Sequence, residues 1–368
     1  MPTFSKLKNV SLKSALAIFI ASSMLSTGCK KADSTTTTST TAAASYQLVN
    51  LVSDTPSFGA LRTDPKLVDA WGMAIGSTGA FWISANGTGS TVIYDNNGAQ
   101  LSAPVSVPLG ALPNGASPSG VVFNTTSDFA ITAPGSGTSL FIYCTENGIL
   151  SAWNAATGVT TQTVADRSAV GAVYKGIAIG SNGGSNFIYA TDFHNAKVDV
   201  YDNTFTYVST IQFTDPTMPA GFAPFNIQNI GGQLYITYAK QKGPLKHDDL
   251  AGAGNGYIDI FTTAGGFVSR FASQGTLNSP WGIVQAPSGF GQAAGSILVG
   301  NFGDGRINVF NASGAYQGQL MNGSTAITVQ GLWALTFDNV SPADPNLLYF
   351  TAGPDAEAHG LFGYLKKM

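Results

Sequence analysis

Trp281-Gly282-Ile283 is one of six related tripeptides, each with an aromatic or polar residue, a mostly small residue and then an apolar one. The others are Trp71-Gly72-Met73, Ser119-Gly120-Val121, Lys175-Gly176-Ile177, Phe225-Asn226-Ile227 and Trp333-Ala334-Leu335. Neighbouring copies are about 50 residues apart, a spacing typical of the blades of a β-propeller. The repeat therefore predicts an all-β fold, a six-bladed β-propeller in which each tripeptide opens the innermost strand of one blade.

A second element of each repeat alternates apolar and polar residues and ends on an aromatic one. Val198-Asp199-Val200-Tyr201 and Ile258-Asp259-Ile260-Phe261 are examples, and such alternation is typical of a strand with two different faces. A turn follows most copies, such as Asp95-Asn96-Asn97-Gly98, in residues that tolerate positive φ. We expect four-stranded blades, with strands a to d from the axis outward. Helix should be scarce after residue 45, since the chain has 44 Gly and 17 Pro.

The two ends of the chain complete each other. Residues 333–337, 347–351 and 361–365 supply three strands of the sixth blade, and the sequence then ends without a fourth. Residues 46–52, Tyr-Gln-Leu-Val-Asn-Leu-Val, are the remaining strand-like segment. Pairing this N-terminal strand with the last one closes the ring and covers an exposed edge. We therefore expect residues 46–368 to form a single propeller domain.

The first residues have the composition of a secretory signal peptide. Three lysines precede an apolar run at residues 15–21, which gives way to small residues that end at Gly28-Cys29. The run is too short to span a membrane, and the order predicts a signal peptide at residues 1–28, with a buried N-terminal helix as the alternative. Gly28-Cys29 resembles the lipobox of bacterial lipoproteins, although Leu25 lies one position farther from the cysteine than usual, with Ser26 in its place.

This resemblance implies that Cys29 is acylated and attaches the protein to a lipid bilayer. Lys30 follows the cysteine where an Asp would favour the inner membrane, so the resemblance implies the outer membrane or the cell surface. Residues 29–45 are mostly Ser, Thr and Ala, a composition that cannot bury enough apolar surface to fold. We expect a disordered tether with a typical span of about 20–25 Å.

Charge and cysteine content exclude several classes of partner. Removal of residues 1–28 leaves 14 basic against 20 acidic side chains, a net charge of −6, so no nucleic-acid partner is expected. With Cys29 acylated, Cys144 has no intramolecular partner. Its apolar strand, Phe141 to Thr145, predicts a buried free thiol.

Several longer segments resemble an uncharacterised family of exported bacterial propeller proteins. They include Tyr189 to Asn195, Asn278 to Gly282, Val299 to Arg306 and Glu357 to Gly363, and the resemblance covers residues 46–364. It implies the fold and export but no reaction. More distantly, the repeat is similar to NHL-type blades, whose pattern is matched best by Asp192 to Val198.

The loops between strands b and c gather the residues best suited to ligand binding. All three histidines, His194, His247 and His359, fall in these loops, which share one face with the starts of the a strands. Carboxylates and basic residues accompany them: Glu146, Asp192, Lys240, Asp248, Asp249, Asp304, Arg306, Asp355 and Glu357. The loop at residues 239–256 is unusually long and charged, which is typical of a lid or binding loop. The alternative is that these residues serve only turn geometry.

Two classes of function fit this face. The first is a membrane-anchored module that binds a protein, peptide or glycan. The second is a metal-assisted hydrolase or lyase that uses Ca²⁺ or Zn²⁺, with His194, His247 and His359 as metal ligands, as in NHL-like propeller lyases. Six-bladed calcium lactonases carry acidic residues and Asn at the axial ends of their a strands, where this chain has only Asn226, which counts against a lactonase.

Overall fold

The computed structural model describes residues 45–109, 115–132 and 134–368. The chain divides into two units, residues 1–42 and 43–368, and only the second is described below. The predicted signal peptide, Cys29 and nearly all of the predicted tether lie outside the described residues. Within the described residues, no helix is long and apolar enough to cross a membrane.

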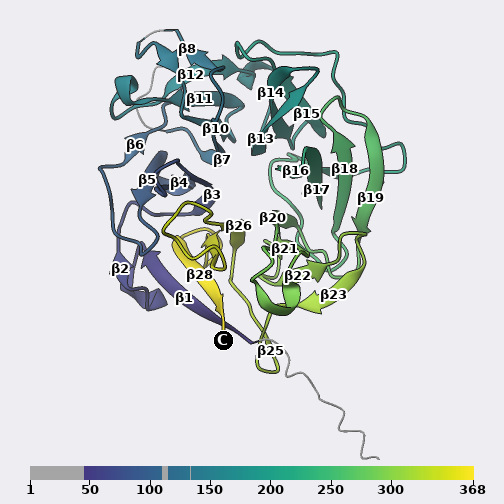
Figure 1. Ribbon diagram of the computed structural model, residues 1–368. Helices are drawn as coiled ribbons and strands as arrows, with labels where there is room; N and C mark the ends of the chain where they lie inside the picture. Colours follow the sequence, from purple (N-terminus) through teal and green to yellow (C-terminus); the bar gives the residue numbers. More distant parts are fainter. Residues whose placement is uncertain (1–44, 110–114, 133) are drawn as a thin grey trace, which may run out of the picture. The chain divides into compact units, whose positions relative to one another are not determined.

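Six sheets surround a central axis, as the sequence repeat predicts (Figure 1). Blades 1 to 3 are β3 (Ala70–Ile75), β4 (Phe81–Ala85), β5 (Ser90–Tyr94) and β6 (Val105–Ser106); β7 (Pro118–Phe123), β10 (Phe141–Thr145), β11 (Ile149–Trp153) and β12 (Gln162–Asp166); and β13 (Tyr174–Asn182), β14 (Ser185–Asp192) and β15 (Lys197–Tyr201).

Blades 4 to 6 complete the ring. They are β16 (Phe222–Ile230), β17 (Gln233–Lys240), β18 (Gly256–Thr262) and β19 (Phe267–Ser273); β20 (Pro280–Gln285), β21 (Ile297–Asn301), β22 (Ile307–Phe310) and β23 (Tyr316–Gln319); and β26 (Leu332–Phe337), β27 (Leu348–Ala352) and β28 (Leu361–Lys367), joined by β1 (Tyr46–Ser53) and β2 (Arg62–Thr63). Helical segments in the described residues are short 3-10 turns, such as Pro56–Phe58 and Gly291–Ala293, so the expected scarcity of helix is confirmed. Two small hairpins, β8 (Ala130–Ile131) with β9 (Gly137–Thr138) and β24 (Met321–Asn322) with β25 (Thr325–Ala326), lie outside the blades.

The N-terminal strand closes the ring. β1 pairs antiparallel with β28, from Tyr46 opposite Lys367 to Ser53 opposite Leu361. The side chains of Tyr46, Leu51 and Val52 are buried, and the Tyr46 hydroxyl donates to the Phe290 carbonyl of blade 5 at 2.8 Å. The predicted closure is therefore confirmed, and β2 adds a fifth, parallel strand to blade 6.

Blade 3 departs from the expected four strands. After β15 the chain makes one bridge, Tyr201 opposite Tyr207, and then leaves the sheet edge. The following segment runs along blade 4 instead, where the Asp215 carboxylate pairs with the Arg270 guanidinium of β19. The prediction of four-stranded blades holds for blades 1, 2, 4 and 5 and is wrong for blade 3 within the described residues.

Close approach of neighbouring blades explains the small residues of the repeated tripeptide. A Cβ added to Gly72 would lie 2.5 Å from the Ser119 carbonyl oxygen, and one added to Gly282 would lie 2.5 Å from the Trp333 carbonyl oxygen. The pairing between strands a and b is interrupted at the tripeptides. Backbone amides of the tripeptides donate instead to hydroxyl groups of strand b. Thr191 Oγ1, for example, accepts from the Gly176 amide at 2.8 Å. The innermost strands are thereby locked into a narrow ring.

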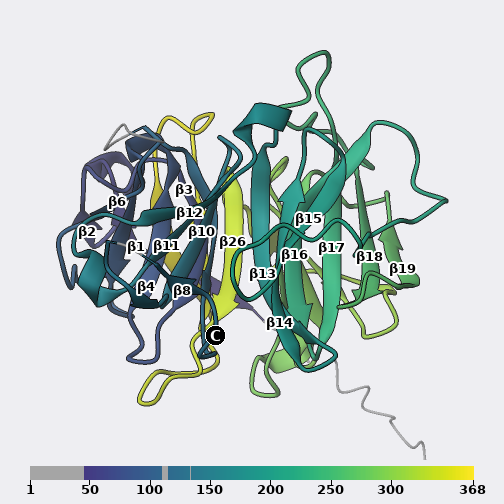
Figure 2. The same ribbon diagram turned by 90° about the horizontal axis from the view of Figure 1, so that it is seen from above.

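Aromatic residues of the same tripeptides pack together near the axis. Trp71, Phe225, Trp281 and Trp333 form one buried cluster with Phe193. Trp333 stacks between Trp71, at a ring separation of 3.7 Å, and Phe302, at 4.1 Å. Figure 2 shows the ring turned by 90°, with innermost strands such as β13 and β26 running between its two faces. The aromatic cluster lies toward the face where the a strands begin.

Candidate functional site

One face of the ring carries both the starts of the a strands and the loops between strands b and c. In blade 1, Ala70 at the start of β3 pairs with Ala85 at the end of β4, so the following loop lies beside the start of β3. The same antiparallel order holds in the other blades. We call this the b–c face, and its centre the b–c mouth.

A buried lysine lies at the b–c mouth. Lys175, the second residue of β13, is only 3% exposed, and its ammonium pairs with the carboxylate of Glu146, which follows β10. The same nitrogen is 4.9 Å from the centre of the Trp71 ring, within the range of a cation–π contact. Burial of an ammonium is tolerated because it has both a carboxylate and a π face as partners.

Two further carboxyl groups face this pair. Asp69, just before β3, is 5% exposed and accepts a hydrogen bond from Trp71 Nε1 at 2.7 Å. Glu357 lies in the loop between β27 and β28. Gly353 lies directly against the Asp69 carboxyl group and close to the Glu357 side chain, so any side chain there would collide with the site.

Burial and mutual repulsion raise the pKa of both groups. Burial, followed by the charges of Glu357 and Glu146, raises the pKa of Asp69 to about 8. Burial also raises the pKa of Glu357 to about 7, with the Lys175 charge opposing and the charges of Glu146 and Asp249 adding to the shift. Near neutral pH, both groups therefore hold a proton for much of the time.

The long loop of blade 4 supplies the outer part of the cluster. His247 Nδ1 lies 2.9 Å from Asp248 Oδ1 and 3.9 Å from Glu146 Oε1. The side chains of His247 and Asp248 are 44% and 66% exposed. Asp249 accepts a hydrogen bond from the Ser279 hydroxyl, and burial raises its pKa. Burial of Asp248 acts in the same direction, but the hydrogen bond with His247 and the Lys175 charge outweigh it and lower the pKa of Asp248.

The b–c mouth therefore combines a buried amine with a surplus of carboxyl groups. We define the mouth cluster as Asp69, Glu146, Lys175, His247, Asp248, Asp249 and Glu357. Their charges act on one another's pKa values, although the residues come from five different blades. Such convergence of perturbed carboxyl groups is typical of functional sites.

Of the candidate site residues named from the sequence, His247, Asp248 and Asp249 belong to this cluster. Glu146 and Glu357, noted as accompanying carboxylates, belong to it as well. The other predicted residues lie on the same face, in or beside the b–c loops, but have different neighbours.

Asp192 and Asp304 hold turns. The Asp192 carboxylate is buried and accepts from the Val173 amide at 3.1 Å and from Asn195 Nδ2 at 2.7 Å. Asp304 accepts from Asn301 Nδ2 at 3.0 Å and from the Arg306 amide at 3.1 Å. For these two residues the alternative of turn geometry describes the contacts that the structure shows.

The three remaining predicted positions are peripheral. Lys240 ends β17, opposite Phe222, while Asp355 and Arg306 are exposed. Asp355 has a φ of 55°, in the left-handed region, and its carbonyl accepts from the Ala358 amide at 3.3 Å. The structure gives none of them a place in the mouth cluster.

The three histidines do not come together. His194 Nδ1 lies 3.0 Å from the Leu245 carbonyl, His247 is in the mouth cluster, and His359 Nδ1 lies 2.8 Å from Asp54 Oδ2. Within the described residues, no group of three or more His, Cys, Asp or Glu side chains is arranged to hold a metal ion. The expectation of a zinc site formed by His194, His247 and His359 is therefore not met, because each imidazole has a different partner, namely the Leu245 carbonyl, Asp248 or Asp54.

Sequence reasoning missed Lys175 and Asp69. Lys175 occupies the first position of the repeated tripeptide, where the other five copies have Trp, Phe or Ser. One charged residue among six equivalent positions that are otherwise uncharged indicates a special role for Lys175. Asp69 had a weaker one, since it lies two residues before Trp71 in the segment that enters blade 1.

The thiol of Cys144 has no role in this site. The residue is free and fully buried, and burial raises the pKa of its thiol to about 12. This confirms the expected buried, free cysteine.

The architecture and the mouth cluster define a six-bladed β-propeller with an acidic site at one mouth of its channel. No model of a known protein family matches the chain. Uncharacterized protein R648 of Acanthamoeba polyphaga mimivirus is 34% identical over 331 residues, which cover 87% of this chain and 80% of the relative. Uncharacterized protein L690 of the same virus is 33% identical over 87% of this chain and 85% of its own. The chain therefore belongs to the same family as these two mimivirus proteins.

This result confirms one part of the predicted resemblance. The chain is a propeller from a family whose members are named as uncharacterized. These relatives are viral, so they give no support to the bacterial and exported character that the resemblance implied.

Solved structures match the fold. Virginiamycin B lyase from Staphylococcus aureus aligns with a TM-score of 0.51 at 12% identity, over 88% of this chain and 100% of its own. A Penicillium chrysogenum α-L-arabinanase complexed with arabinobiose gives 0.53 at 14% identity, over 87% and 97%. The gluconolactonase XC5397 from Xanthomonas campestris gives 0.50 at 13%, over 82% and 87%. At these identities the likeness shows the fold alone.

The raised pKa values of Asp69 and Glu357 predict a pH dependence of stability. Because both pKa values are higher in the folded state than in the unfolded chain, the folded protein binds more protons between about pH 4 and 8. These two groups should therefore lower the free energy of unfolding as pH rises through this range. Urea denaturation at pH 5 and pH 8 measures this change. From pH 5 to pH 8, the free energy of unfolding should fall less for Asp69→Asn/Glu357→Gln than for the parent protein. Equal losses in the two proteins would contradict the assignment.

Proposed function

We propose that this protein is a ligand-binding propeller and that its b–c mouth binds a cationic group, such as the Lys or Arg side chain of a protein or peptide. The surplus of carboxyl groups around Lys175 is the observation that carries this proposal. Asp69, Glu146, Asp248, Asp249 and Glu357 face one lysine and one histidine, and burial together with mutual repulsion raises the pKa values of Asp69 and Glu357 to about 8 and 7. An added positive charge would relieve that repulsion.

The arrangement favours a cationic partner over a neutral glycan. A glycan is held mainly by neutral hydrogen bonds and by stacking on exposed aromatic faces. Here the aromatic faces are already occupied, because Trp333 is stacked on Trp71 and on Phe302. The exposed carboxylate of Asp248 and the half-buried Glu357 are instead suited to a charge-assisted hydrogen bond with an ammonium or guanidinium group.

Capped tripeptides test this proposal. We expect acetyl-Gly-Arg-Gly-amide to bind, acetyl-Gly-Glu-Gly-amide not to bind, and the affinity for the first to fall with added salt. Glu357→Gln and Asp248→Asn should each weaken binding by about tenfold. Asp166→Asn, which removes the same charge from the outer strand β12, is the matched control and should leave affinity unchanged. The proposal is refuted if Glu357→Gln and Asp248→Asn both bind the arginine peptide as tightly as the parent protein does. It is also refuted if the parent protein binds the glutamate peptide as tightly as the arginine peptide.

Acid–base catalysis is the second candidate for the same site. The specific observation is that Asp69 and Glu357, with pKa values of about 8 and 7, lie beside the carboxylate of Glu146, which is paired with Lys175. One protonated and one ionised carboxyl group are the usual parts of an acid–base pair. The lyase, lactonase and arabinanase with this fold make hydrolysis or elimination the reactions to test first. We would favour this candidate if the protein turns over 4-nitrophenyl glycosides or gluconolactone and Glu357→Gln abolishes that turnover. The same variant should weaken peptide binding by no more than the tenfold expected above.

We also propose that Cys29 is acylated and holds the propeller at the outer membrane or the cell surface. The support comes from the order of basic, apolar and small residues that ends at Gly28-Cys29. Expressed in a bacterium, the parent chain should partition with membranes, whereas Cys29→Ser should accumulate as an uncut precursor or a soluble form. Equal partitioning of the two would argue against acylation.

A further inference from the structure

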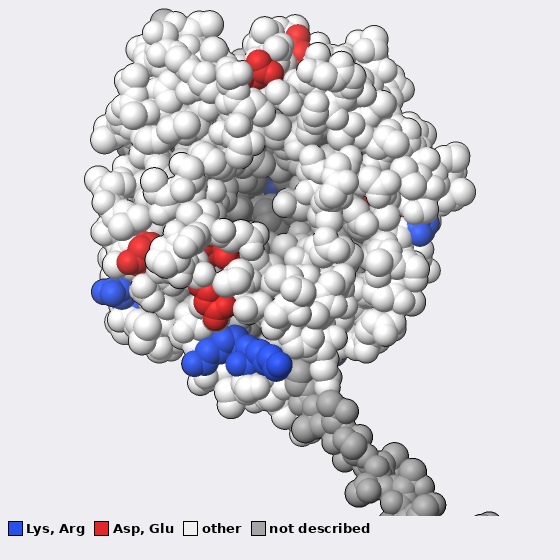
Figure 3. Space-filling view, in the orientation of Figure 1, with Lys and Arg blue, Asp and Glu red and all other residues white. Residues whose placement is uncertain are grey.

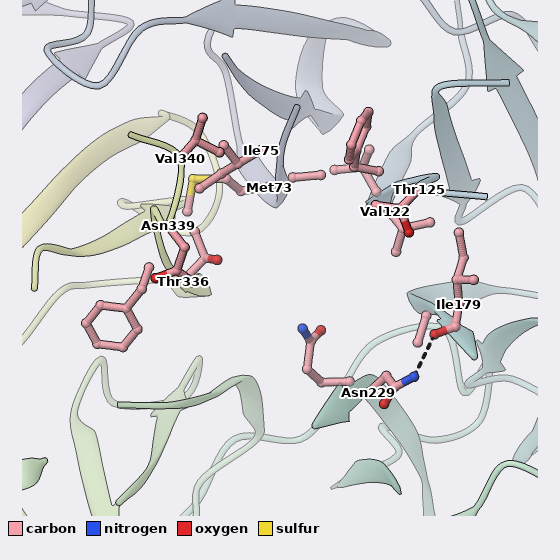
Figure 4. A pocket seen from close by; sticks show the side chains of 15 residues that line it. Met73, Ile75, Val122, Thr125, Ile179, Asn229, Thr336, Asn339 and Val340 are labelled. Atoms are coloured by element: carbon pink, nitrogen blue, oxygen red, sulfur yellow. Dashed lines mark hydrogen bonds between the residues drawn. The ribbon is translucent and has the colours of Figure 1, made fainter. Parts of the chain in front are cut away.

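The opposite face of the ring, where the a strands end, has a cavity of its own. Its volume is about 430 Å³, and the ends of β3, β7, β13, β16 and β26 form its wall (Figure 4). Since these are the innermost strands of five blades, the cavity is the second mouth of the central channel. We call it the a–b mouth, after the loops that surround it.

The wall of the a–b mouth has the composition of a small-molecule site. Met73, Ile75, Val122 and Ile179 give it apolar surfaces. The polar groups are neutral amides and hydroxyls, supplied by Thr125, Gln228, Asn229, Thr336 and Asn339. None of the described residues that line it is charged, and the hollow at the centre of Figure 3 is likewise surrounded by mostly uncharged side chains.

Part of this wall is held in place before any ligand arrives. Asn229 Nδ2 donates to the Ile179 carbonyl at 3.0 Å, drawn as the dashed line in Figure 4, and Asn229 Oδ1 accepts from the Gly232 amide at 3.0 Å. Both bonds orient the amide and tie the end of β16 to β13. A preformed wall lowers the entropic cost of binding.

The channel becomes narrow below this cavity. Its waist, lined by Gly72, Gly120, Asn226 and Gly282, encloses about 50 Å³. That volume holds a few water molecules but no organic ligand, since one water needs about 10–15 Å³ of such space. A molecule in the a–b mouth would therefore stop at the waist and would not reach the mouth cluster.

We propose that the a–b mouth is a second ligand site, which takes an uncharged small molecule that has both an apolar surface and a hydrogen-bonding group. Its volume lies in the usual range for such sites, about 300–1,000 Å³. A charged ligand would lose hydration without gaining an ionic partner, whereas the amides and hydroxyls can satisfy a neutral donor or acceptor. The two ends of the channel thus select opposite chemistries.

A second apolar hollow must be distinguished from this site. A groove of about 460 Å³ lies between blades 1 and 2, with Trp82, Phe141 and Trp153 in its wall and Leu101 and Val159 exposed at its rim. Its apolar wall makes it the competing location for an apolar probe. Variants of its rim therefore serve as the control.

A matched pair of fluorescent probes tests the proposal. N-phenyl-1-naphthylamine is neutral and carries one N–H donor, whereas 8-anilinonaphthalene-1-sulfonate has the same aromatic body with an added sulfonate. We expect the neutral probe to bind at one site per chain, with increased and blue-shifted emission, and the sulfonate to bind at least about tenfold more weakly.

Variants at the two hollows locate the probe. Thr125→Trp and Asn339→Trp each place an indole in the a–b mouth from an exposed position, and each should weaken binding of the neutral probe by about tenfold or more. Leu101→Asp/Val159→Asp should leave its affinity unchanged, and thermal melting checks that all variants fold. Loss of binding in the groove variant alone, full binding in both Trp variants, or equal affinity for the two probes would overturn the proposal.

Discussion

A chain that begins at residue 54 should unfold with a free energy at least about 5 kcal/mol lower than a chain that begins at residue 45. The deletion removes β1, whose Tyr46, Leu51 and Val52 are buried, and each such apolar side chain contributes about 1.5–3 kcal/mol. It also exposes β28 as an unpaired edge and opens the ring between blades 6 and 1. Urea denaturation followed by tryptophan fluorescence measures the difference.

A chain that begins at residue 30 is the control for this deletion. Residues 30–44 have a composition that cannot form a packed core, so their removal should change stability by less than about 0.5 kcal/mol. If the chains that begin at residues 45 and 54 melt alike, the N-terminal strand is not what closes the ring.

Lys175→Met should cost about 3–5 kcal/mol of stability at pH 7.5, the usual effect of removing one partner of a buried ion pair. Methionine keeps most of the volume of the lysine side chain but carries no charge, so the loss reports on the ion pair with Glu146 and the cation–π contact with Trp71. Without the ammonium, the carboxylate of Glu146 would face Asp69 and Glu357 with no cation between them. The loss should shrink at pH 5, because these carboxyl groups can then hold protons at little cost.

Lys242→Met is the matched control for this variant. Lys242 is exposed on the long loop of blade 4, so its substitution should change stability by less than about 0.5 kcal/mol at either pH. A Lys175→Met variant that loses the same stability at pH 5 and pH 7.5 would show that Lys175 acts through packing and not through its charge.

The fold could be predicted because the repeat appears directly in the sequence. Six tripeptides with Gly, Ala or Asn in the middle mark the positions where neighbouring innermost strands touch. Residues 46–52 are the strand-like segment that remains once the strands of the six repeats are assigned, and they supply the closing strand. Blade 3 was mispredicted because outer strands are short and half exposed. Nothing in residues 202–221 shows that the chain crosses to blade 4 to meet Arg270.

The site was predicted only in part, because a turn and a binding loop use the same residue types. Asp192 and Asp304 hold turns, while Asp248 and Asp249 face the b–c mouth, yet all four read as acidic loop residues. Lys175 and Asp69 join them through the convergence of five blades on one axis. That convergence depends on the three-dimensional packing of the ring, which a linear pattern does not contain.

Proton release on binding shows directly whether the b–c mouth holds a surplus of carboxyl groups suited to a cation. A cation bound beside Asp69 and Glu357 lowers their pKa values from about 8 and 7, so protons must leave at pH 7. Titration calorimetry of acetyl-Gly-Arg-Gly-amide in phosphate and in Tris gives the number released from the difference in heat between the buffers. We expect a net release approaching about one proton at pH 7 in the parent protein and a smaller release in Glu357→Gln. Binding with no release, or with uptake of protons, would contradict it.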